Sequence, residues 1–263
     1  MQQQYLDAYD AQLRTTPEVS DASSTVEHGP LLLATFPGGR GFITYAGLGD
    51  LDADGVALLV DAATDHFVLV PEVTEVEWKT RGHDRAPGLH DALIARGFVP
   101  EDPESIMVGE AQLLAQQVDI PTQVTIRRSR SDDEVLAAGE MQGLVFDDPD
   151  WRSRAESLIV RLHEDASTEL WIALVDDVVV SAGRLEPVAG TEFAGLWGGA
   201  TLPEWRGRGI YRALTAERAR SALSRGIRYL QSDSTEFSRP ILERSGFLKV
   251  STTTPYVWTR PSI

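Results

Sequence analysis

Apolar and polar positions follow two periodicities along the chain, one typical of helices and one typical of strands. Together they predict a mixed α/β protein. The apolar runs "LLLATF" (31–36) and "GFITYAGL" (41–48), joined by "PGGR", predict a β-hairpin. The stretch "DLDADGVALLVDAA" has helical spacing, with Asp50 or Asp52 as its candidate N-cap. Residues 15–30, which come before the hairpin, are rich in turn-forming residues and are expected to form a loop.

The second half follows a polar passage at 113–123, where Pro121 and the loss of periodicity predict a domain boundary. After it we expect the order β-α-α-β-β-β-α-β-α-β. Ser131 and Glu134 predict a capping box at the start of the first of these helices. The end of the chain, "FLKVSTTTPYVW", is expected to form a closing strand pair or one bent strand.

A faint internal repeat connects the two halves. A short helix followed by Gly-Phe is expected at 89–98 and again at 238–247, while the loop "RGRG" occurs only in the second half. We therefore predict two domains of related fold, 1–115 and 122–263.

Composition narrows the functional classes. Forty acidic residues against 24 Lys and Arg give a net charge of −16, which argues against nucleic-acid binding. The charge suits a cationic or amine substrate, and solubility alone explains it equally well. There is no cysteine, no pattern of a secretory signal and no apolar run near the ~20 residues that span a bilayer, so a cytoplasmic protein without membrane contact is expected. The oligomeric state, monomer or homodimer, stays open.

The stretch "TLPEWRGRGIYRAL" (201–214) is the best candidate for binding chemistry. An apolar strand ends there and a helix begins, so unpaired backbone N–H groups and the helix dipole favour an anion such as a pyrophosphate. Gly207 and Gly209 permit close approach of the backbone. The spacing fits neither the P-loop nor the Rossmann fingerprint. An ordinary helix start on a basic surface is the alternative.

In its context this loop resembles the phosphate loop of the GNAT superfamily of acetyl-CoA-dependent N-acetyltransferases. Arg206, Gly209 and Tyr211 occupy the three motif positions, although a small residue is expected where Tyr211 stands. The downstream pair Gly246-Phe247 matches the usual end of a helix in that family. The resemblance covers roughly residues 122–260. It implies a mixed, mostly antiparallel sheet flanked by helices, with 1–115 as a second, degenerate GNAT-like domain that lacks the loop.

The resemblance further implies acetyl-CoA as co-substrate, with pantetheine pairing to the end of a strand and pyrophosphate resting on the loop. The residues expected to bind it are Ala200, Thr201, Leu202, Arg206, Gly207, Arg208, Gly209, Ile210, Tyr211, Arg212 and Ser238.

The catalytic acid and base are less clear. Many family members carry a tyrosine four residues before the glycine of the Gly-Phe pair, and here that position is Leu242. Tyr256, Tyr229, Ser238 or water are the substitutes, of which we select Tyr256. Glu186 is the candidate base or amine ligand, and an exposed glutamate at a strand end is the alternative. No metal is expected.

Trp151 and Trp197 are candidates for lining a substrate pocket. The alternative, which is commoner for tryptophan, is burial in the hydrophobic core. We therefore expect an N-acetyltransferase that acts on the primary amine of a small molecule or an aminoacyl compound. A catalytically inactive CoA-binding sensor is the alternative. Aminoacyl transfer from charged tRNA is a third hypothesis, against which the net charge counts.

Overall fold

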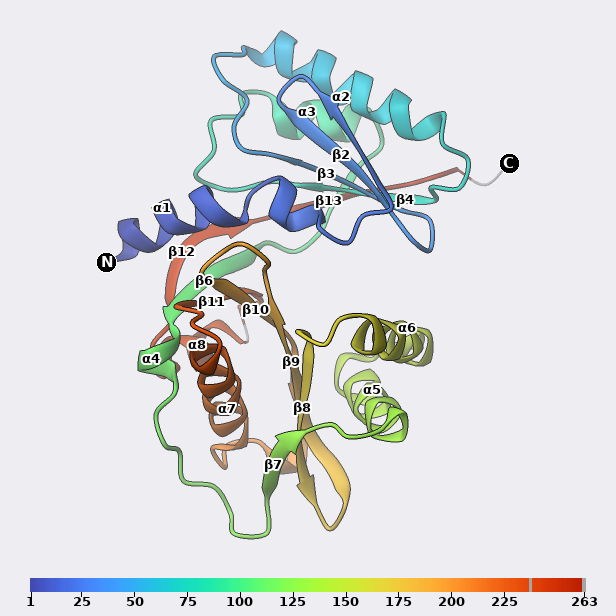
Figure 1. Ribbon diagram of the computed structural model, residues 1–263. Coiled ribbons are helices and arrows are strands. Elements are labelled where there is room, and N and C mark those ends of the chain that lie inside the picture. Colours follow the sequence, from blue (N-terminus) through green and yellow to red (C-terminus); the bar gives the residue numbers. More distant parts are fainter. Residues whose placement is uncertain (237, 262–263) are drawn as a thin grey trace. The chain divides into compact units, whose positions relative to one another are not determined.

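The computed structural model describes residues 1–236 and 238–261, which fold into two compact units (Figure 1). The first compact unit comprises Met1–Ile106, Asp233–Arg239 and Lys249–Ile263, and the second comprises Met107–Ser232 and Pro240–Leu248. Both units combine helices with mostly antiparallel sheets, as predicted. The predicted domains 1–115 and 122–263 are contiguous, whereas the compact units exchange segments; the domains stay a prediction about independently folding parts.

The first compact unit is built on a six-stranded sheet of order β1-β2-β3-β4-β13-β5. Its strands are β1 (Ser24–His28), β2 (Leu31–Phe36), β3 (Arg40–Tyr45), β4 (Glu75–Lys79), β5 (Val99–Pro100) and β13 (Pro255–Thr259). Its helices are α1 (Gln2–Leu13), a 3₁₀ turn (Thr16–Val19), α2 (Ala53–Val68) and α3 (Leu89–Ala95). The hairpin of β2 and β3 and the cap Asp52 of α2 confirm the sequence predictions.

The sequence prediction missed β1, which lies inside the expected loop 15–30. All five of its residues are exposed, so no alternation of apolar and polar positions marks the strand. It exists because β2 offers an unpaired edge along the antiparallel register from Ser24↔Thr35 to His28↔Leu31.

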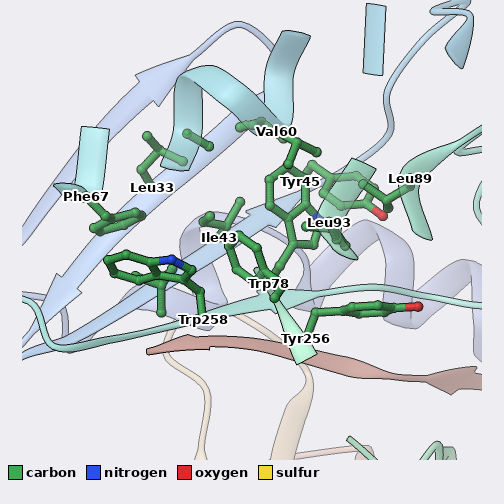
Figure 2. Close-up of a cluster of buried hydrophobic side chains, with 14 of the residues drawn as sticks. Leu33, Ile43, Tyr45, Val60, Phe67, Trp78, Leu89, Leu93, Tyr256 and Trp258 are labelled. Carbon is green, nitrogen blue, oxygen red and sulfur yellow. The ribbon is translucent and has the colours of Figure 1, made fainter. Parts of the chain in front are cut away.

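The core of the first compact unit depends on the last strand of the chain. Tyr256 and Trp258 of β13 pack in one buried cluster with Trp78 of β4 and with α2, for example Val60 and Phe67 (Figure 2). β13 pairs antiparallel with β4 and with β5. Of the two expectations for the end of the chain, the closing strand pair is wrong, because β13 does not fold back on β12. The two strands follow each other with one residue between them, as in the expected bent strand, and β13 joins the six-stranded sheet.

The second compact unit carries most of a seven-stranded sheet of order β12-β6-β11-β10-β9-β8-β7. Its strands are β6 (Glu104–Glu110), β7 (Thr125–Arg128), β8 (Glu169–Val175), β9 (Val178–Pro187), β10 (Phe193–Thr201), β11 (Tyr229–Ser234) and β12 (Leu248–Thr253). The helices are α4 (Ala111–Leu114), α5 (Asp132–Phe146), α6 (Trp151–Glu164), a 3₁₀ turn (Pro203–Trp205), α7 (Ile210–Ser224) and α8 (Arg239–Ser245). Figure 1 shows α5 and α6 on one face of this sheet and α7 on the other.

The internal repeat is visible as two helix ends of the same geometry. After α3, Gly97 has φ +84° and the N–H of Phe98 donates to Leu93 O. After α8, Gly246 has φ +106° and the N–H of Phe247 donates to Leu242 O. The left-handed residue ends each helix, and the following phenylalanine is buried.

Candidate functional site

The candidate site begins where two parallel strands of the second compact unit stop pairing. β10 and β11 pair only from Phe193↔Tyr229 to Gly195↔Gln231, although β10 continues to Thr201. On its other side β10 stays paired with β9, with a bulge between Trp197 and Ala200. Within the described residues, no strand pairs with this edge of β10 after Gly195, and we call the place where β10 and β11 part the gap.

The bulge decides which backbone groups face this gap. Gly198 takes φ +60°, a left-handed value that glycine adopts without strain. The N–H of Leu202 donates to Val180 O of β9, so the alternation of an antiparallel strand directs Ala200 and Leu202 toward β9 and Thr201 toward the gap. Of the three predicted cofactor contacts, Ala200 and Thr201 end β10 and Leu202 follows it, and Thr201 has the backbone orientation that such a contact needs.

The loop after β10 presents a row of unpaired donors. Within the part of the chain that the structure describes, the backbone N–H groups from Gly207 to Arg212 have no recorded acceptor, and the first bond of this region runs from Ala213 N to Gly209 O. Gly207 and Gly209 have φ +73° and +81°. No side chain caps α7, whose N-cap is Gly209 itself. Free main-chain donors at a helix start are the groups that an anion site made from main chain needs, and anion binding at this loop stays a prediction.

Three arginines surround these donors and carry uncompensated charge. Among the described residues, no carboxylate lies within ion-pair distance of Arg206, Arg208 or Arg212. The guanidinium of Arg208 stacks 4.7 Å from the ring centre of Trp205, and Arg206 Nε donates to Thr201 O at 3.0 Å. The loop therefore concentrates positive charge in a protein of net charge −16.

The corresponding junction in the first compact unit has the opposite character. There β3 and β4 are parallel and stay paired from Arg40↔Glu75 to Ile43↔Trp78. The helix that follows β3, α2, is capped by Asp52, whose Oδ1 accepts the N–H of Gly55 at 2.9 Å, and Asp54 lies in its first turn. A carboxylate thus takes the place that an anionic ligand would occupy.

Tyr211, the unusual residue of the loop, is accommodated by a glycine of the bulge. A Cβ at Gly199 would lie 2.7 Å from Tyr211 Cε2, so the ring occupies the space that a side chain at Gly199 would fill. The Tyr211 hydroxyl accepts a hydrogen bond from Arg218. The ring points toward the sheet, and the N–H of Tyr211 stays in the row of free donors.

Arg218 is a fully buried cation without a carboxylate partner in the described chain. Its guanidinium lies against Gly183 of β9 and donates to Arg184 O at 3.1 Å and to Thr215 Oγ1 at 3.2 Å. Burial lowers its pKa, although contact with Tyr211 works in the other direction. Tyr211 and Arg218 together fill the α7 face of the sheet beneath the bulge.

Comparison with known proteins agrees with this geometry. Residues 136–247 match the Acetyltransferase (GNAT) family. This part of the chain is a GNAT domain.

Solved structures resemble nearly the whole chain. A GCN5-related N-acetyltransferase from Kribbella flavida gives a TM-score of 0.69 at 16% identity, covering 93% of this chain and 92% of that one. A GCN5-related N-acetyltransferase from Sphaerobacter thermophilus gives 0.64 at 16%, covering 89% and 78%. A tandem GNAT protein from the clavulanic acid biosynthesis pathway gives 0.62 at 14%, covering 89% and 79%. At these identities the likeness concerns the fold. No curated protein matches the sequence.

Glu186 lies on the opposite face of the sheet from α7, engaged by two arginines. Arg184 Nε donates to Glu186 Oε1 at 2.7 Å, and Arg161 of α6 lies 3.2 Å from Oε2. Trp197 is directly across from Arg184 on β10. The carboxylate is thus inside the GNAT domain and near the bulge, with both oxygens paired. Its role as base stays a prediction.

The candidates for the catalytic acid do not all belong to the same compact unit. Tyr256 is part of the first compact unit, where its hydroxyl lies 2.8 Å from His90 Nδ1. Ser238 belongs to the Asp233–Arg239 segment of that unit and donates to Thr235 O. In the GNAT domain, Tyr229 stacks on Phe193 where β10 and β11 are still paired, and Leu242 is buried in the core. The assignment of the acid therefore stays a prediction.

Sequence reasoning missed the roles of Arg218 and Gln142, and it missed that Gly199 leaves room for the Tyr211 ring. Gln142 of α5 donates to Gly198 O at the bulge. The position of Arg218 on the buried side of α7 was a signal that the sequence offered. Its contact with Tyr211 is seen only in the structure. Trp151, the first residue of α6, packs against Gly139 and Gly143 of α5 and is half-buried, so its role in a pocket stays a prediction.

Two negative findings hold for the described residues. No helix there is long and apolar enough to cross a membrane. No group of three or more His, Asp or Glu side chains is arranged to hold a metal ion.

Proposed function

We propose that the GNAT domain transfers an acetyl group from acetyl-CoA to the primary amine of a small molecule. The observation that carries the proposal is the row of N–H groups from Gly207 to Arg212, which have no acceptor among the described residues, beside three arginines that have no carboxylate partner there. A diphosphate group matches this combination of dipole, donors and positive charge. At the gap between β10 and β11, the N–H of Thr201 is directed toward a linear substituent of that diphosphate, while the Thr201 carbonyl already accepts from Arg206 Nε.

The chemistry needs little from covalent catalysis by the protein. Bound acetyl-CoA supplies a thioester whose C–S bond breaks as the amine nitrogen bonds to the acetyl carbon, with the proton lost by the amine ending on the CoA thiolate. The chain's own contribution is to hold both groups at the bulge, exclude water and offer main-chain N–H groups to the carbonyl oxygen.

We also propose that only the second compact unit binds acetyl-CoA. The α2 end of the first unit is capped by Asp52 and carries Asp54, so a diphosphate there would meet negative charge and a donor already in use. The net charge of −16 supports a small amine rather than a charged tRNA as acceptor.

An acyl-CoA-binding sensor without turnover is the second candidate function. The buried Leu242, at the position where the resemblance places a tyrosine acid, is the observation that favours it. Turnover of acetyl-CoA with any amine rules it out, and tight binding without turnover across a broad amine panel supports it.

The test of the anion site uses Gly207 rather than Gly209. A Cβ at Gly209 would lie 2.8 Å from Asp119 O, so substitution there would disturb the fold, whereas nothing lies within 4 Å of a Cβ at Gly207. Asn and Asp tolerate the left-handed backbone of Gly207, so Gly207→Asn and Gly207→Asp are a matched pair that differs in charge. Calorimetry should show acetyl-CoA binding to Gly207→Asp at least ~30-fold weaker than to Gly207→Asn, since a carboxylate ~5 Å from a diphosphate costs about 2 kcal/mol or more.

The control is Arg152→Glu on α6, whose side chain is exposed and pairs with Glu156. It changes net charge more than Gly207→Asp does and should leave acetyl-CoA affinity within about 2-fold. Equal affinities of the two Gly207 variants, or no binding by a folded wild type, would leave the loop as a plain helix start.

A further inference from the structure

The two faces of the sheet differ at the β10 bulge, and this difference gives an acceptor a direction of approach. On the α7 face, the Tyr211 ring lies against Gly199 and the Arg218 guanidinium lies against Gly183. Arg218 is buried and Tyr211 half-buried, so this face is filled. On the other face, beneath α5 and α6, the side chains around Gly198 are polar and partly exposed. The acceptor therefore reaches the bulge from the α5–α6 face.

The polar groups on that face form a cluster, which we call the bulge cluster: Gln142, Arg161, Arg184, Glu186 and Trp197. Arg184 and Glu186 alternate with the inward Gly183 and Leu185 along β9. In register across the strands, Arg184 is opposite Trp197, and Glu186 is opposite Gly195. The Trp197 indole folds over Gly195, where a Cβ would collide with its Nε1.

The charges of this cluster do not cancel. One carboxylate, Glu186, faces two guanidinium groups, Arg184 and Arg161, which leaves one unit of positive charge. Glu186 engages Arg184 through Nε only, and no described residue accepts from the two terminal nitrogens of Arg184. One of these nitrogens is 3.4 Å from the Cβ position of Gly198. The Arg184 side chain is 29% exposed, so its guanidinium group is partly desolvated and still accessible to a ligand.

We propose that the acceptor is an amino acid-type molecule, an amine that also carries a carboxylate, and that Arg184 together with Arg161 binds this carboxylate. A planar fork with two free terminal nitrogens matches a carboxylate in bidentate geometry. The single excess charge matches one carboxylate better than a dianionic phosphate. Trp197 supplies the apolar wall along the carbon chain between the two groups. The proposal rests on the proposed acetyl transfer and names its acceptor class.

The experiment compares acceptors that differ only in this charge. Glycine, β-alanine and γ-aminobutyrate are each paired with the corresponding amide, and kcat/KM is measured with acetyl-CoA. We expect at least one acid to exceed its amide by 10-fold or more, and Arg184→Gln to abolish that preference by raising the KM of the acid. Arg161→Gln should weaken the preference less, because Arg161 is 45% exposed.

Arg152→Gln is the matched control, because Arg152 lies on α6 with Arg161 and is 66% exposed. It should keep the acid-over-amide preference. Circular dichroism and acetyl-CoA affinity check that each variant is folded. Should Arg184→Gln misfold, Arg161→Gln and the wild-type preference still test the proposal.

Two failures are distinguishable. If acetyl-CoA does not bind, the proposed function falls. If it binds, with the expected contrast between the Gly207 variants, but amides or aminoalkylphosphonates are used as well as the acids, only the carboxylate assignment is overturned. An acid preference that survives in Arg184→Gln also overturns it.

Discussion

At the scale of single residues, two side chains and two glycines hold the start of α7 against the sheet. Tyr211 fits because Gly199 has no Cβ, and Arg218 fits because Gly183 has none. The hydrogen bond between Arg218 and the Tyr211 hydroxyl compensates part of the cost of burying the charge. The position of the free N–H groups therefore depends on the packing of Tyr211, in the first turn of α7, and of Arg218, about two turns further along the helix.

This packing predicts that Gly199→Ala destabilises the protein by about 1–3 kcal/mol, because the new methyl group would lie 2.7 Å from the Tyr211 ring. In a Tyr211→Ala background the same change should be nearly neutral, since the ring is gone. Urea denaturation of the four proteins of this double-mutant cycle measures the coupling.

Gly47→Ala is the control for glycine replacement as such, because nothing lies within 4 Å of its Cβ position. It should leave the free energy of unfolding unchanged or raise it by up to about 1 kcal/mol. A cost of Gly199→Ala that is the same in both backgrounds would show that Tyr211 does not set it.

At the scale of elements, α5 begins with a cap that differs in one detail from the predicted box. Ser131 Oγ accepts the N–H of Glu134, as predicted. The Glu134 carboxylate, however, accepts the N–H of Arg130 and pairs with Arg127 of β7 rather than returning to Ser131. The capping glutamate therefore also ties the helix to the neighbouring strand.

This contact predicts a pH dependence. Hydrogen bonds from Arg127 and Arg130 hold the pKa of Glu134 at about 2, below its ordinary value of 4.5. A depressed native pKa stabilises the fold above pH ~4.5, and this stabilisation is lost as the pH falls toward 2. Because the pair touches solvent, we expect about 1 kcal/mol. Urea unfolding should give Glu134→Gln a deficit at pH 6 that shrinks by pH 3. A deficit that does not change with pH would assign the loss to the helix cap alone.

At the scale of the whole molecule, the last strand of the chain completes the first sheet. β13 inserts between β4 and β5 and contributes Tyr256 and Trp258 to the core of the first compact unit. The core of that unit therefore includes residues that are distant in sequence from its other strands. In the same way β6, from the first half of the sequence, joins the seven-stranded sheet beside β11.

We predict that Trp258→Ala lowers the free energy of unfolding of the first compact unit by about 3–5 kcal/mol, because a large buried side chain leaves a cavity. Thr259→Ala, one residue further on the same strand and exposed, should change it by less than about 0.5 kcal/mol. Chemical denaturation followed by tryptophan fluorescence and by circular dichroism checks both. Similar small losses in the two variants would mean that β13 contributes little to the core.

The sequence by itself determined the elements whose signals are local. Apolar periodicity placed the hairpin of β2 and β3, and Ser131 and Asp52 placed the starts of α5 and α2. The glycines after residue 205 predicted the left-handed turn and the start of α7, because both depend on neighbouring residues. Phosphate binding at this loop stays a prediction.

The tertiary structure alone decided what depends on residues distant in sequence. The exposed β1 forms because it pairs with β2, and β13 pairs in a different sheet from the strand before it. Tyr211 contacts Arg218 and Gly199 only when helix and sheet pack. Strand pairing and side-chain packing are long-range interactions, so the local pattern leaves their partners open. For the same reason the bulge cluster, drawn from α5, α6, β9 and β10, becomes visible only in the folded chain.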